Sequence, residues 1–323
     1  MNVTVIIPNY NGIRFLPDCL ASLRQQTFRD FSVVVVDNGS TDGSVRFVEE
    51  HYPEVQVLAL DRNRGFAYAV NAGIMASTAP FVMLLNNDTA AAPDCLAYLM
   101  EGIRQSDSIF SVGARIVQMQ EPRRIDTTGD FYSLPGYAFC RGQGLTDYPR
   151  TSGEVFTNCG CAVLYRRELL DRTGLFDPRF FAYLEDVDLG MRARRLGYRN
   201  LYVPEAIVRH VGSGTTGAKY TEFKVFYSAR NNLWLRRKNL TILQRILHAP
   251  FAAAGMLMKY FFFRRLGLQN AYRKGCLRGM TGGFTAAQRE GCPKGAAAFL
   301  RTEPWIWYGT FLYIRQFLRR KLR

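Results

Sequence analysis

Residues 3–42 read VTVIIPNYNGIRFLPDCLASLRQQTFRDFSVVVVDNGSTD, and this stretch decides the fold class. It holds two apolar runs, Val3–Pro8 and Ser32–Asp37, each of which is typical of a strand buried in a sheet. Between them, apolar residues recur at helical spacing from Phe15 to Leu23. A strand, a helix and a second strand in this order predict a parallel pair joined by a right-handed crossover.

The same alternation continues along the chain. Val55–Leu60 resembles a strand, Phe66–Ala76 a helix and Phe81–Asn86 another strand. We therefore predict an α/β fold with a mostly parallel central sheet flanked by helices. Ligands bind beyond the carboxyl ends of the strands in such sheets, so the polar residues at those ends are the first site candidates.

The second half of the chain is less regular. We expect short strands and a mobile loop from Gln118 to Gly153, because this stretch is rich in Gly, Pro and Thr. The later predicted elements are a strand at Asn158–Tyr165, a helix at Asp186–Leu196 ended by Gly197, short strands at Leu201–Val203 and Ala206–Val211, and a helix at Lys219–Lys238.

Charge is distributed unevenly along the 323 residues. Residues 1–216 hold 21 basic and 24 acidic residues, whereas residues 217–323 hold 21 basic and 3 acidic ones, which together give the formal charge of +15. Aromatic and basic residues interleave in the second part, as in Lys259–Arg265 and around Trp305–Tyr308. Such a region predicts contact with phosphates, either on nucleic acid or on an anionic membrane.

The cysteines and the hydropathy pattern predict a cytoplasmic protein. The seven cysteines are odd in number and form no CxxC pair, so we expect free thiols in a reducing compartment. A strand-like segment stands where a signal peptide would begin. The longest apolar stretch, Ala249–Phe263, is too short to span a membrane and contains Lys259.

Two polar motifs follow predicted strands. Asp37 opens the sequence Asp-Asn-Gly-Ser-Thr-Asp42, and its carboxylate could accept from the imide N–H of a pyrimidine base. An ordinary turn with a helix cap explains this motif equally well. Asp88 ends Asn86-Asn-Asp88 and is a hard oxygen ligand suited to a divalent cation that holds a diphosphate. For the tripeptide alone, an Asx turn is the better explanation.

Three acids in four residues, Glu185-Asp-Val-Asp188, begin a predicted helix after Phe180-Phe-Ala-Tyr183. They could cap that helix electrostatically, or one of them could be a general base partly desolvated by an aromatic wall. His210 ends a predicted strand in the same layer as the acids, which favours a ligand role, although a lone histidine is more often structural.

Gly212-Ser-Gly-Thr-Thr-Gly217 fits the pattern GxGxxG. No acid follows about 20 residues later, as dinucleotide binding requires, so we reject that function. A flexible loop near a phosphate remains consistent with this motif.

Together and in this order, the motifs resemble glycosyltransferase family 2, whose members are inverting enzymes of the GT-A fold. The resemblance covers about residues 3–235 and is greatest to the rhamnosyltransferase-like branch that builds bacterial surface polysaccharides. The residues that carry it are Val5–Gly12 (VIIPNYNG), Val36–Asp42 (VDNGSTD), Asn63–Phe66 (NRGF), Asn71–Gly73 (NAG), Leu84–Asp88 (LLNND), Phe180–Leu189 (FFAYLEDVDL) and His210.

The resemblance implies a role for each matching residue. Asp186 would be the general base, and Asp88 and His210 would contact a divalent cation, Mg²⁺ or Mn²⁺. The residues expected to bind the nucleotide sugar are Pro8, Asn9, Asp37, Arg64, Asn86 and Glu185. Asn86 replaces the first aspartate of the family's DxD motif, which puts the metal affinity in doubt. Tyr227–Asn231 is similar to a late Arg-Asn segment of the family, without an assigned role.

The resemblance implies transfer of a sugar, with rhamnose a candidate, from a UDP- or dTDP-sugar to a hydroxyl of a glycan or lipid-linked acceptor. Residues 1–238 would form the GT-A catalytic domain, and residues 239–323 a helical, basic region that docks on a membrane or acceptor. We expect a peripheral protein on the inner face of the cell membrane, without a nucleic-acid partner. The alternatives are a nucleotidyltransferase and a nucleic-acid-binding protein that uses the basic region.

Overall fold

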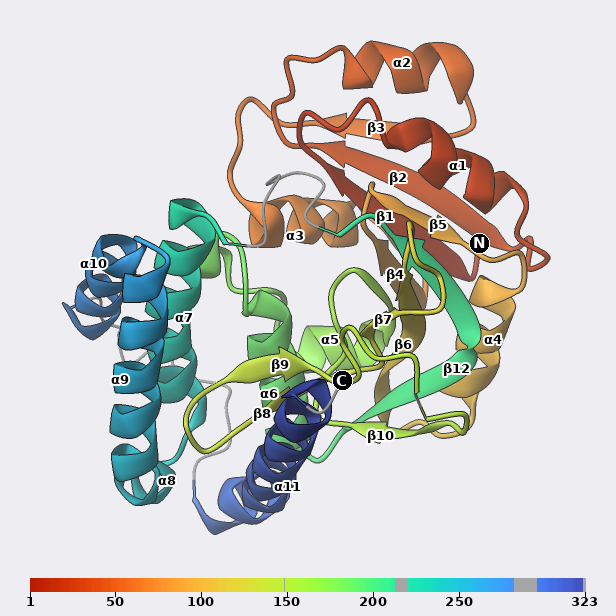
Figure 1. The fold of residues 1–323 in the computed structure, drawn as a ribbon. Coiled ribbons are helices and arrows are strands. Elements are labelled where there is room, and N and C mark those ends of the chain that lie inside the picture. Colours follow the sequence, from red (N-terminus) through yellow and green to blue (C-terminus); the bar gives the residue numbers. More distant parts are fainter. Residues whose placement is uncertain (148, 213–219, 282–294, 322–323) are drawn as a thin grey trace.

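The computed structural model describes residues 1–147, 149–212, 220–281 and 295–321. Its centre is a ten-stranded sheet with the order β10-β12-β6-β11-β4-β1-β2-β3, in which β5 also pairs with β12 and β7 with β6 (Figure 1). The strands are β1 Val3–Asn9, β2 Phe31–Asp37, β3 Gln56–Ala59, β4 Phe81–Leu85, β5 Thr89–Ala91, β6 Ile109–Gln118, β7 Ile125–Thr127, β10 Gly153–Val155, β11 Ala162–Arg166 and β12 Arg199–His210.

The predicted α/β class is confirmed. β1 pairs in parallel with both β2 and β4, β2 with β3, and β6 with β12. The sheet is mixed beyond β4 because β11 runs antiparallel between β4 and β6. A separate hairpin of β8 Asp130–Tyr132 and β9 Ala138–Cys140 lies outside this sheet.

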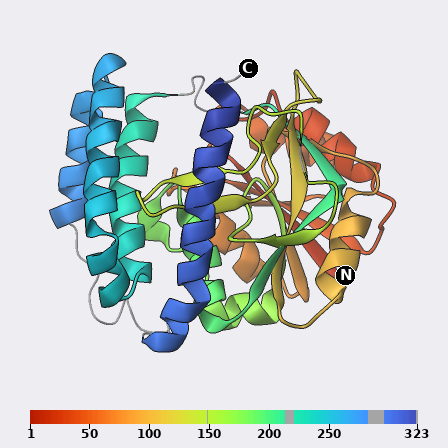
Figure 2. The ribbon, with the colours of Figure 1, turned by 60° about the horizontal axis from the view of Figure 1, so that its bottom comes forward.

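Helices cover both faces of the sheet and continue into the C-terminal region (Figures 1 and 2). Those before the C-terminal region are α1 Leu16–Arg24, α2 Ser44–His51, α3 Phe66–Ala76, α4 Cys95–Arg104, α5 Arg167–Thr173, α6 Glu185–Leu196 and α7 Glu222–Asn239, with a 3-10 helix at Pro178–Phe180. The C-terminal ones are α8 Ile242–Leu247, α9 Ala249–Arg265, α10 Gln269–Thr281 and α11 Ala296–Lys321.

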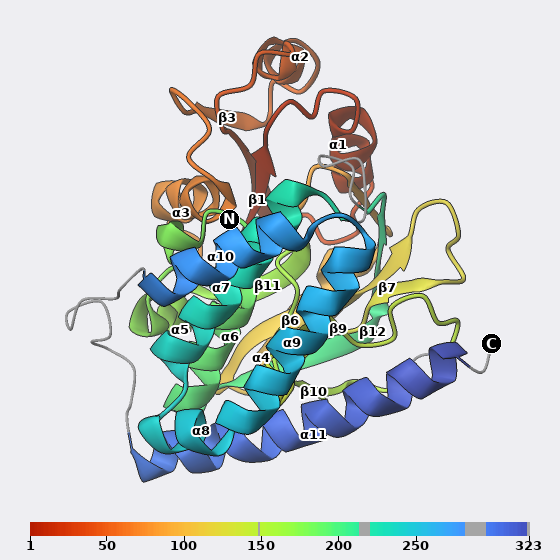
Figure 3. The ribbon, with the colours of Figure 1, turned by 60° about the vertical axis from the view of Figure 1, so that its left-hand side comes forward.

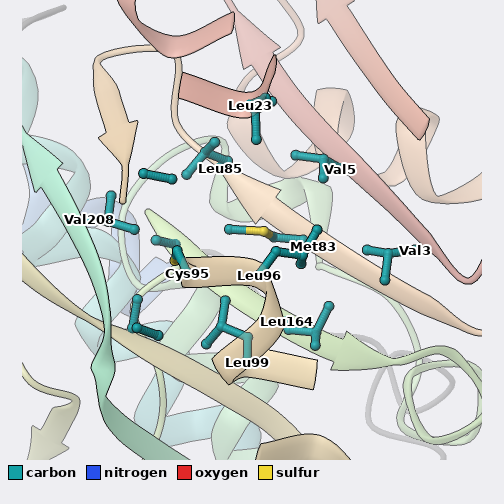
Figure 4. Close-up of a cluster of buried hydrophobic side chains, with 14 of the residues drawn as sticks. Val3, Val5, Leu23, Met83, Leu85, Cys95, Leu96, Leu99, Leu164 and Val208 are labelled. Atoms are coloured by element: carbon teal, nitrogen blue, oxygen red, sulfur yellow. The ribbon is translucent and has the colours of Figure 1, made fainter. Parts of the chain in front are cut away.

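The alternation of side chains along β1 divides the core into two layers. Val5 points with Met83 toward α1 and α4, whereas Ile6 points toward α3. Figure 4 shows the first layer, in which Leu96 and Leu99 of α4 lie near Met83 and Leu164 of the sheet. Because both faces are covered, β1 and β4 are buried along nearly their whole length rather than alternately buried and exposed.

The sequence-based element boundaries need correction in the last strand. The short strands expected at Leu201–Val203 and Ala206–Val211 are one strand, β12, whose register with β6 shifts between Val203 and Ile207. Pro204 lies in that shift and has no N–H for the ladder, which accounts for the break in the sequence pattern. The glycine motif that begins at Gly212 lies almost entirely outside the described residues.

The C-terminal region is helical, as predicted, and its last helix packs on the α/β body. Ile306 of α11 is fully buried in one apolar cluster with Phe131 and Met191. Thr310 Oγ1 accepts from the backbone N–H of Leu134 at 2.9 Å. Figure 2 shows α11 crossing in front of the body, so residues 296–321 complete the core of the preceding domain.

A buried ionic cluster joins α6 to the end of α7. Asp188, which has no exposed surface, accepts from Lys238 Nζ at 2.7 Å, Asn239 Nδ2 at 2.7 Å and Arg192 Nε at 3.0 Å. Burial alone would raise the pKa of Asp188, but the charges of Lys238 and Arg192 outweigh burial and hold the pKa below its usual value. The third acid of the Glu185–Asp188 cluster is therefore structural.

We expect Asp188→Asn to lower the free energy of unfolding by about 3–5 kcal/mol, because buried cations lose their counter-charge. Since the folded-state pKa is depressed, this stabilisation is complete above about pH 4 and is lost as the pH falls further. Urea unfolding at several pH values measures both effects. Asp171→Asn is the control: the Asp171 side chain is 54% exposed, so its pair with Arg167 is worth less than about 1 kcal/mol. Equal losses in the two variants would contradict the prediction.

Candidate active site

The carboxyl ends of β1 and β2 are joined by side-chain hydrogen bonds. Asn9 Nδ2 donates to Asp37 Oδ1 at 2.9 Å, and Ser40 N–H donates to Asp37 Oδ2 at 2.8 Å. Asp37 is 2% exposed, and its bond from Ser40 closes the turn that follows β2. Each carboxylate oxygen has a second lone pair, so Asp37 keeps acceptor capacity for a ligand at this edge. Pro8 of β1 lies in register with Val36 of β2, the residue before Asp37.

Gly12 permits a close approach in this corner. Asn87 Nδ2 donates to Asn9 Oδ1 at 2.7 Å, and a Cβ on Gly12 would lie 2.0 Å from the same nitrogen. A side chain at position 12 would therefore displace the amide that fixes Asn9.

Arg64 lies on the turn before α3. Its guanidinium contacts Asp61 at 2.9 Å and stands 4.9 Å from the Tyr68 ring centre. Its backbone N–H donates to Asn38 Oδ1 at 2.9 Å, which holds the turn beside the end of β2. The structure thus places Arg64 near the Asn9–Asp37 corner, with its side chain about one third exposed.

A second group of polar residues gathers where β4 ends. Asp88 is 6% exposed, and its Oδ1 lies 3.2 Å from Nε2 of His210, the last residue of β12. The other ring nitrogen, Nδ1, lies 2.6 Å from Asp126 Oδ2. Burial would lower the pKa of His210, but Cys161, Asp126 and Asp88 together raise it above the usual value. The surrounding groups therefore favour the protonated imidazole, which would release its Nε2 proton on binding a metal ion.

These residues fit a divalent cation. Asn86 Oδ1 is buried and has no hydrogen-bond partner among the described residues, although buried carbonyl oxygens normally have one. Asp88 adds a carboxylate and His210 an imidazole, and oxygen donors with imidazole suit Mg²⁺ or Mn²⁺. Asp126 faces the far nitrogen of His210, as in the carboxylate–histidine–metal arrangement that fixes a ligand's tautomer.

Asp186 lies in the first turn of α6 and is held by backbone donors. Gly160 N–H donates to its Oδ2 at 2.9 Å and Val187 N–H to its Oδ1 at 2.7 Å. Burial raises the pKa of Asp186 even though these hydrogen bonds favour the carboxylate. All three acids lie in the first turn of α6, where the electrostatic capping explanation expects them, although the N-cap residue is Leu184, whose side chain makes no cap hydrogen bond.

Asp130 and Cys159 lie close to Asp186, and no motif in the sequence singled out either residue. One ligand atom of each of the three residues lies within 4.8 Å of the others. Thr127 Oγ1 donates to Asp130 at 2.9 Å, and burial together with the charge of Asp186 raises the pKa of Asp130 to about 8. The charge of Asp186 therefore favours the protonated form of Asp130.

Glu185 is also buried beside this pair. Its Oε2 atom has no hydrogen-bond partner among the described residues, and the side chain is 7% exposed. Burial and the charge of Asp186 raise the pKa of Glu185 well above its usual value. The protonated form is therefore favoured, in contrast to a solvated glutamate.

The turn before α6 has an unusual backbone. Phe181, Tyr183 and Leu184 have φ values of 65°, 71° and 69°, a region that side chains larger than glycine rarely occupy. Such conformations persist only where the surroundings impose them. This turn, residues 180–184, leads directly into Glu185 and Asp186, so its conformation sets where both acids begin.

Asn231 and Arg230 of α7 supply the constraint. Asn231 Nδ2 lies 2.9, 2.8 and 2.7 Å from the carbonyl oxygens of Phe180, Ala182 and Tyr183, and the residue has no exposed surface. The Arg230 guanidinium donates to the carbonyls of Arg179 and Phe180 and stands 4.2 Å from the Trp234 ring centre. The Arg-Asn pair seen in the sequence therefore positions the 180–184 turn.

The same turn also contacts the beginning of α3. Phe66 N–H donates to the Phe181 carbonyl at 2.6 Å. A Cβ on Gly65 would lie 2.6 Å from the Phe181 ring, so this position accepts only glycine, whose φ is 88°. The turn thus connects α3 and Arg64 on one side with Asp186 on the other.

A cavity of about 820 Å³ lies elsewhere, against β5 and the outer side of β12. Its lining includes Asp18, Arg115, Arg123 and Arg209. None of the site residues predicted from the sequence lines it, so it is separate from the Asp37, Asp88 and Asp186 corner.

Comparisons with known proteins agree with this geometry. A family model described as "Glycosyl transferase family 2" matches residues 4–174. An N-acetylglucosaminyl-diphospho-decaprenol L-rhamnosyltransferase of Mycobacterium tuberculosis is 30% identical over an alignment of 269 positions, which covers 72% of this chain and 86% of that protein.

Two solved structures share the fold. GalNAc-T7 with UDP, GalNAc and Mn²⁺ superposes with a TM-score of 0.61 at 17% identity, over 74% of this chain and 48% of that one. The mannosyltransferase PcManGT from Pyrobaculum calidifontis, in complex with GDP-Man and Mn²⁺, gives 0.57 at 19% identity, over 87% of each chain. The expected GT-A fold is thereby confirmed.

We predict that Asn231→Leu lowers the free energy of unfolding by about 1–3 kcal/mol, because three buried carbonyls lose a donor. Amide hydrogen exchange should accelerate most in residues 180–187, where the turn and Asp186 lie. Asn232→Leu is the control, since Asn232 Oδ1 accepts from Tyr132 OH and does not contact the turn. Unchanged exchange in residues 180–187 of the Asn231 variant would refute the positioning role.

We predict that Asp126→Asn weakens Mn²⁺ binding by about 10–100-fold, because the far nitrogen of His210 loses its carboxylate partner. Isothermal titration of Mn²⁺ in the presence of UDP measures this affinity. Asp107→Asn is the control, since the Asp107 side chain is fully exposed and pairs with Arg166 at 3.5 Å. Equal affinities of the Asp126 variant and the unaltered protein would show that His210 needs no such partner.

Proposed function

The chain belongs to glycosyl transferase family 2, and we propose that it is an inverting enzyme that uses a UDP- or dTDP-sugar as donor. The acceptor is a hydroxyl of a glycan or of a lipid-linked sugar in cell-surface polysaccharide synthesis. Rhamnose is the proposed sugar, because the Mycobacterium tuberculosis relative is named an L-rhamnosyltransferase that acts on a diphospho-decaprenol substrate. Family membership favours glycosyl transfer over the nucleotidyl transfer considered as an alternative.

One observation carries this proposal: the segment Cys159–Cys161 lies beside both a metal-type donor set and a buried carboxylate. Cys161 lies within electrostatic range of His210 and Asp88, and Cys159 within range of Asp130 and Asp186. A donor whose diphosphate lies at Asp88 and His210 would therefore place its sugar toward Asp186. Asp37 and Asn9, on neighbouring strand ends, are in position for the nucleoside, with Pro8 and Arg64 beside them.

In the proposed reaction, Asp186 accepts the proton of the acceptor hydroxyl. The oxygen attacks the anomeric carbon from the face opposite the diphosphate, a new C–O bond forms, and the bond to the diphosphate breaks with inversion. Asn86, Asp88 and His210 would hold a divalent cation, which when bound offsets the negative charge on the leaving diphosphate. The backbone N–H groups of Gly160 and Val187 orient the Asp186 carboxylate.

The environment of Asp186 suits a base that works near neutral pH. A general base is most effective when its pKa is close to the working pH, and burial raises the pKa of Asp186 toward that range. Because the base must be deprotonated, the rate should fall as the pH falls through this raised pKa. Glu185, whose pKa is raised well above its usual value, is suited to donate a hydrogen bond to the donor sugar rather than to accept the proton.

We predict that Asp186→Asn reduces turnover by ~10²–10⁴-fold while leaving donor binding nearly unchanged. The matched variant is Glu185→Gln, which should lose far less activity because the glutamine resembles the protonated acid. Thermal unfolding with UDP, dTDP, GDP or ADP, each with and without Mn²⁺, measures binding, since a ligand of the folded state raises its stability.

A Mn²⁺-dependent stabilisation by UDP or dTDP alone would support the donor site. Absence of stabilisation by every diphosphate would overturn the proposed function. Collapse of nucleotide binding in Asp186→Asn would show that this carboxylate is a ligand instead of the base.

A lipid-linked acceptor lies at a membrane. We accordingly propose a cytoplasmic protein that is peripheral on the inner face of the cell membrane. Among the described residues, no helix has the length and the apolar character needed to cross a bilayer.

A further inference from the structure

Exposed apolar side chains concentrate on the C-terminal helices. On α8, Ile242, Leu243, Ile246 and Leu247 are between 49% and 69% exposed. On the opposite side of this short helix, Gln244 is fully buried and donates to Thr302 and Glu303 of α11. The side of α8 that faces away from the protein is therefore almost wholly apolar.

The outer face of α9 continues this surface. Leu257, Met258 and Phe261 are 57%, 56% and 48% exposed. The inner face of the same helix packs closely, since a Cβ on Gly255 would lie 2.4 Å from the Pro135 carbonyl oxygen. A helix that is apolar on both its inner and its outer side is normally covered on both.

α11 has the same two-sided character. Trp307, Phe311, Ile314 and Leu318 are between 52% and 59% exposed and recur every three or four residues, which places them in one stripe. Ile306, on the other side, is fully buried. The stripe is thus additional to the apolar side that α11 uses to pack on the body.

These helices form one continuous surface. The Phe251 ring of α9 lies 6.4 Å from the Trp307 ring of α11, and both rings are about half exposed. Figure 3 shows α8, α9 and α11 along the outside of one side of the molecule. We call the outward side chains of these three helices the apolar face. It exceeds the scattered exposed apolar residues normal for a protein surface.

Among the described residues of the C-terminal helices, the exposed charges around the apolar face are basic, and Asp147 of the body pairs with one of them, Arg319, at 3.2 Å. Glu303 is the single acidic residue among the described residues from Leu240 to Arg320, and it is buried against His248 at 2.8 Å. Exposed arginines stand at the ends of the helices, at positions 264 and 265 of α9 and 315, 319 and 320 of α11. The apolar face therefore has cations at its rim and no exposed carboxylate within it.

We propose that the apolar face lies in the plane of an anionic bilayer. Its aromatic and aliphatic side chains would enter the boundary between headgroups and acyl chains, while the rim arginines meet lipid phosphates. This proposal rests on the proposed function only in that a lipid-linked acceptor would be located at the bilayer surface.

Charge excludes the simplest other occupants. A second copy of the chain would bring two cationic rims together, which is repulsive. A nucleic acid would need cations along the centre of the surface, where this face is aliphatic.

The apolar face borders the active site. Phe262 of α9 contacts Tyr220, with ring centres 5.5 Å apart, just before α7 begins. In the first turns of α7, Phe223 contacts both Tyr183 and Phe181 of the 180–184 turn, at 6.2 Å each. An acceptor anchored in the bilayer would reach Asp186 along these aromatic rings. These contacts lead from α9 to the 180–184 turn, which precedes the proposed base Asp186.

The test is co-sedimentation of the full chain with vesicles of phosphatidylcholine alone or of phosphatidylcholine with phosphatidylglycerol. We expect binding to the anionic vesicles and a loss of about tenfold or more in the triple variant Leu257→Gln, Phe261→Gln, Phe311→Gln. Met75→Gln is the control, because Met75 is 65% exposed but lies on α3. The tryptophan emission, in which Trp307 is the exposed contributor, should shift to shorter wavelength and be quenched by nitroxide-labelled lipid.

Equal vesicle binding by the triple variant and the unaltered protein would overturn the proposal. It would also be overturned if an oligonucleotide or a concentration-dependent dimer, rather than vesicles, protected Trp307. Should the triple variant fail to fold, quenching of Trp307 in the unaltered protein decides. The Mn²⁺-dependent stabilisation by UDP, measured in the same samples without lipid, keeps a failure of docking distinct from a failure of the donor site.

Discussion

The side-chain amide of Asn231 holds together parts of the molecule that have different tasks. It contacts three carbonyls of a turn in which three residues take left-handed backbone conformations. That turn accepts the N–H of Phe66, at the start of α3, and continues into Asp186 of α6. Because α7 carries Asn231, a late helix fixes a turn that leads into site residues, Glu185 and Asp186, which come earlier in the chain.

Asp188 and Asp186 are similar buried side chains whose neighbours give them different ionisation behaviour. Asp188 lies against Lys238 and Arg192 and remains charged, so it stabilises the fold. Asp186, two residues earlier, has only backbone donors and lies near a second carboxyl, Asp130, whose pKa is about 8. The first acid is kept ionised by cations, while the second is kept poised by the absence of a cation among its hydrogen-bond partners in the described structure.

Local patterns predicted the elements that depend on local spacing. Helix α3 has the predicted bounds, and β1 and α6 differ from the prediction by one residue. The sequence also singled out Asp88 and His210, which the structure brings to 3.2 Å. It did not single out Asp126 or Asp130, because their partners are distant in the chain and their own stretch has no periodicity: Asp126 contacts a residue 84 positions away. The task of Arg230 and Asn231 was equally invisible, since it lies in carbonyls about 50 positions earlier.

The position of α11 has a consequence for biosynthesis. Ile306 fills a cluster that includes Phe131 and Met191, so these side chains stay uncovered until the last part of the chain has been made. At the usual rate of translation, on the order of ten seconds separate the synthesis of Met191 from that of Ile306. During that interval the nascent body presents an open apolar surface to the surrounding chaperones. The helix that closes the body also carries part of the apolar face, so the same final event completes the enzyme and creates its proposed lipid contact.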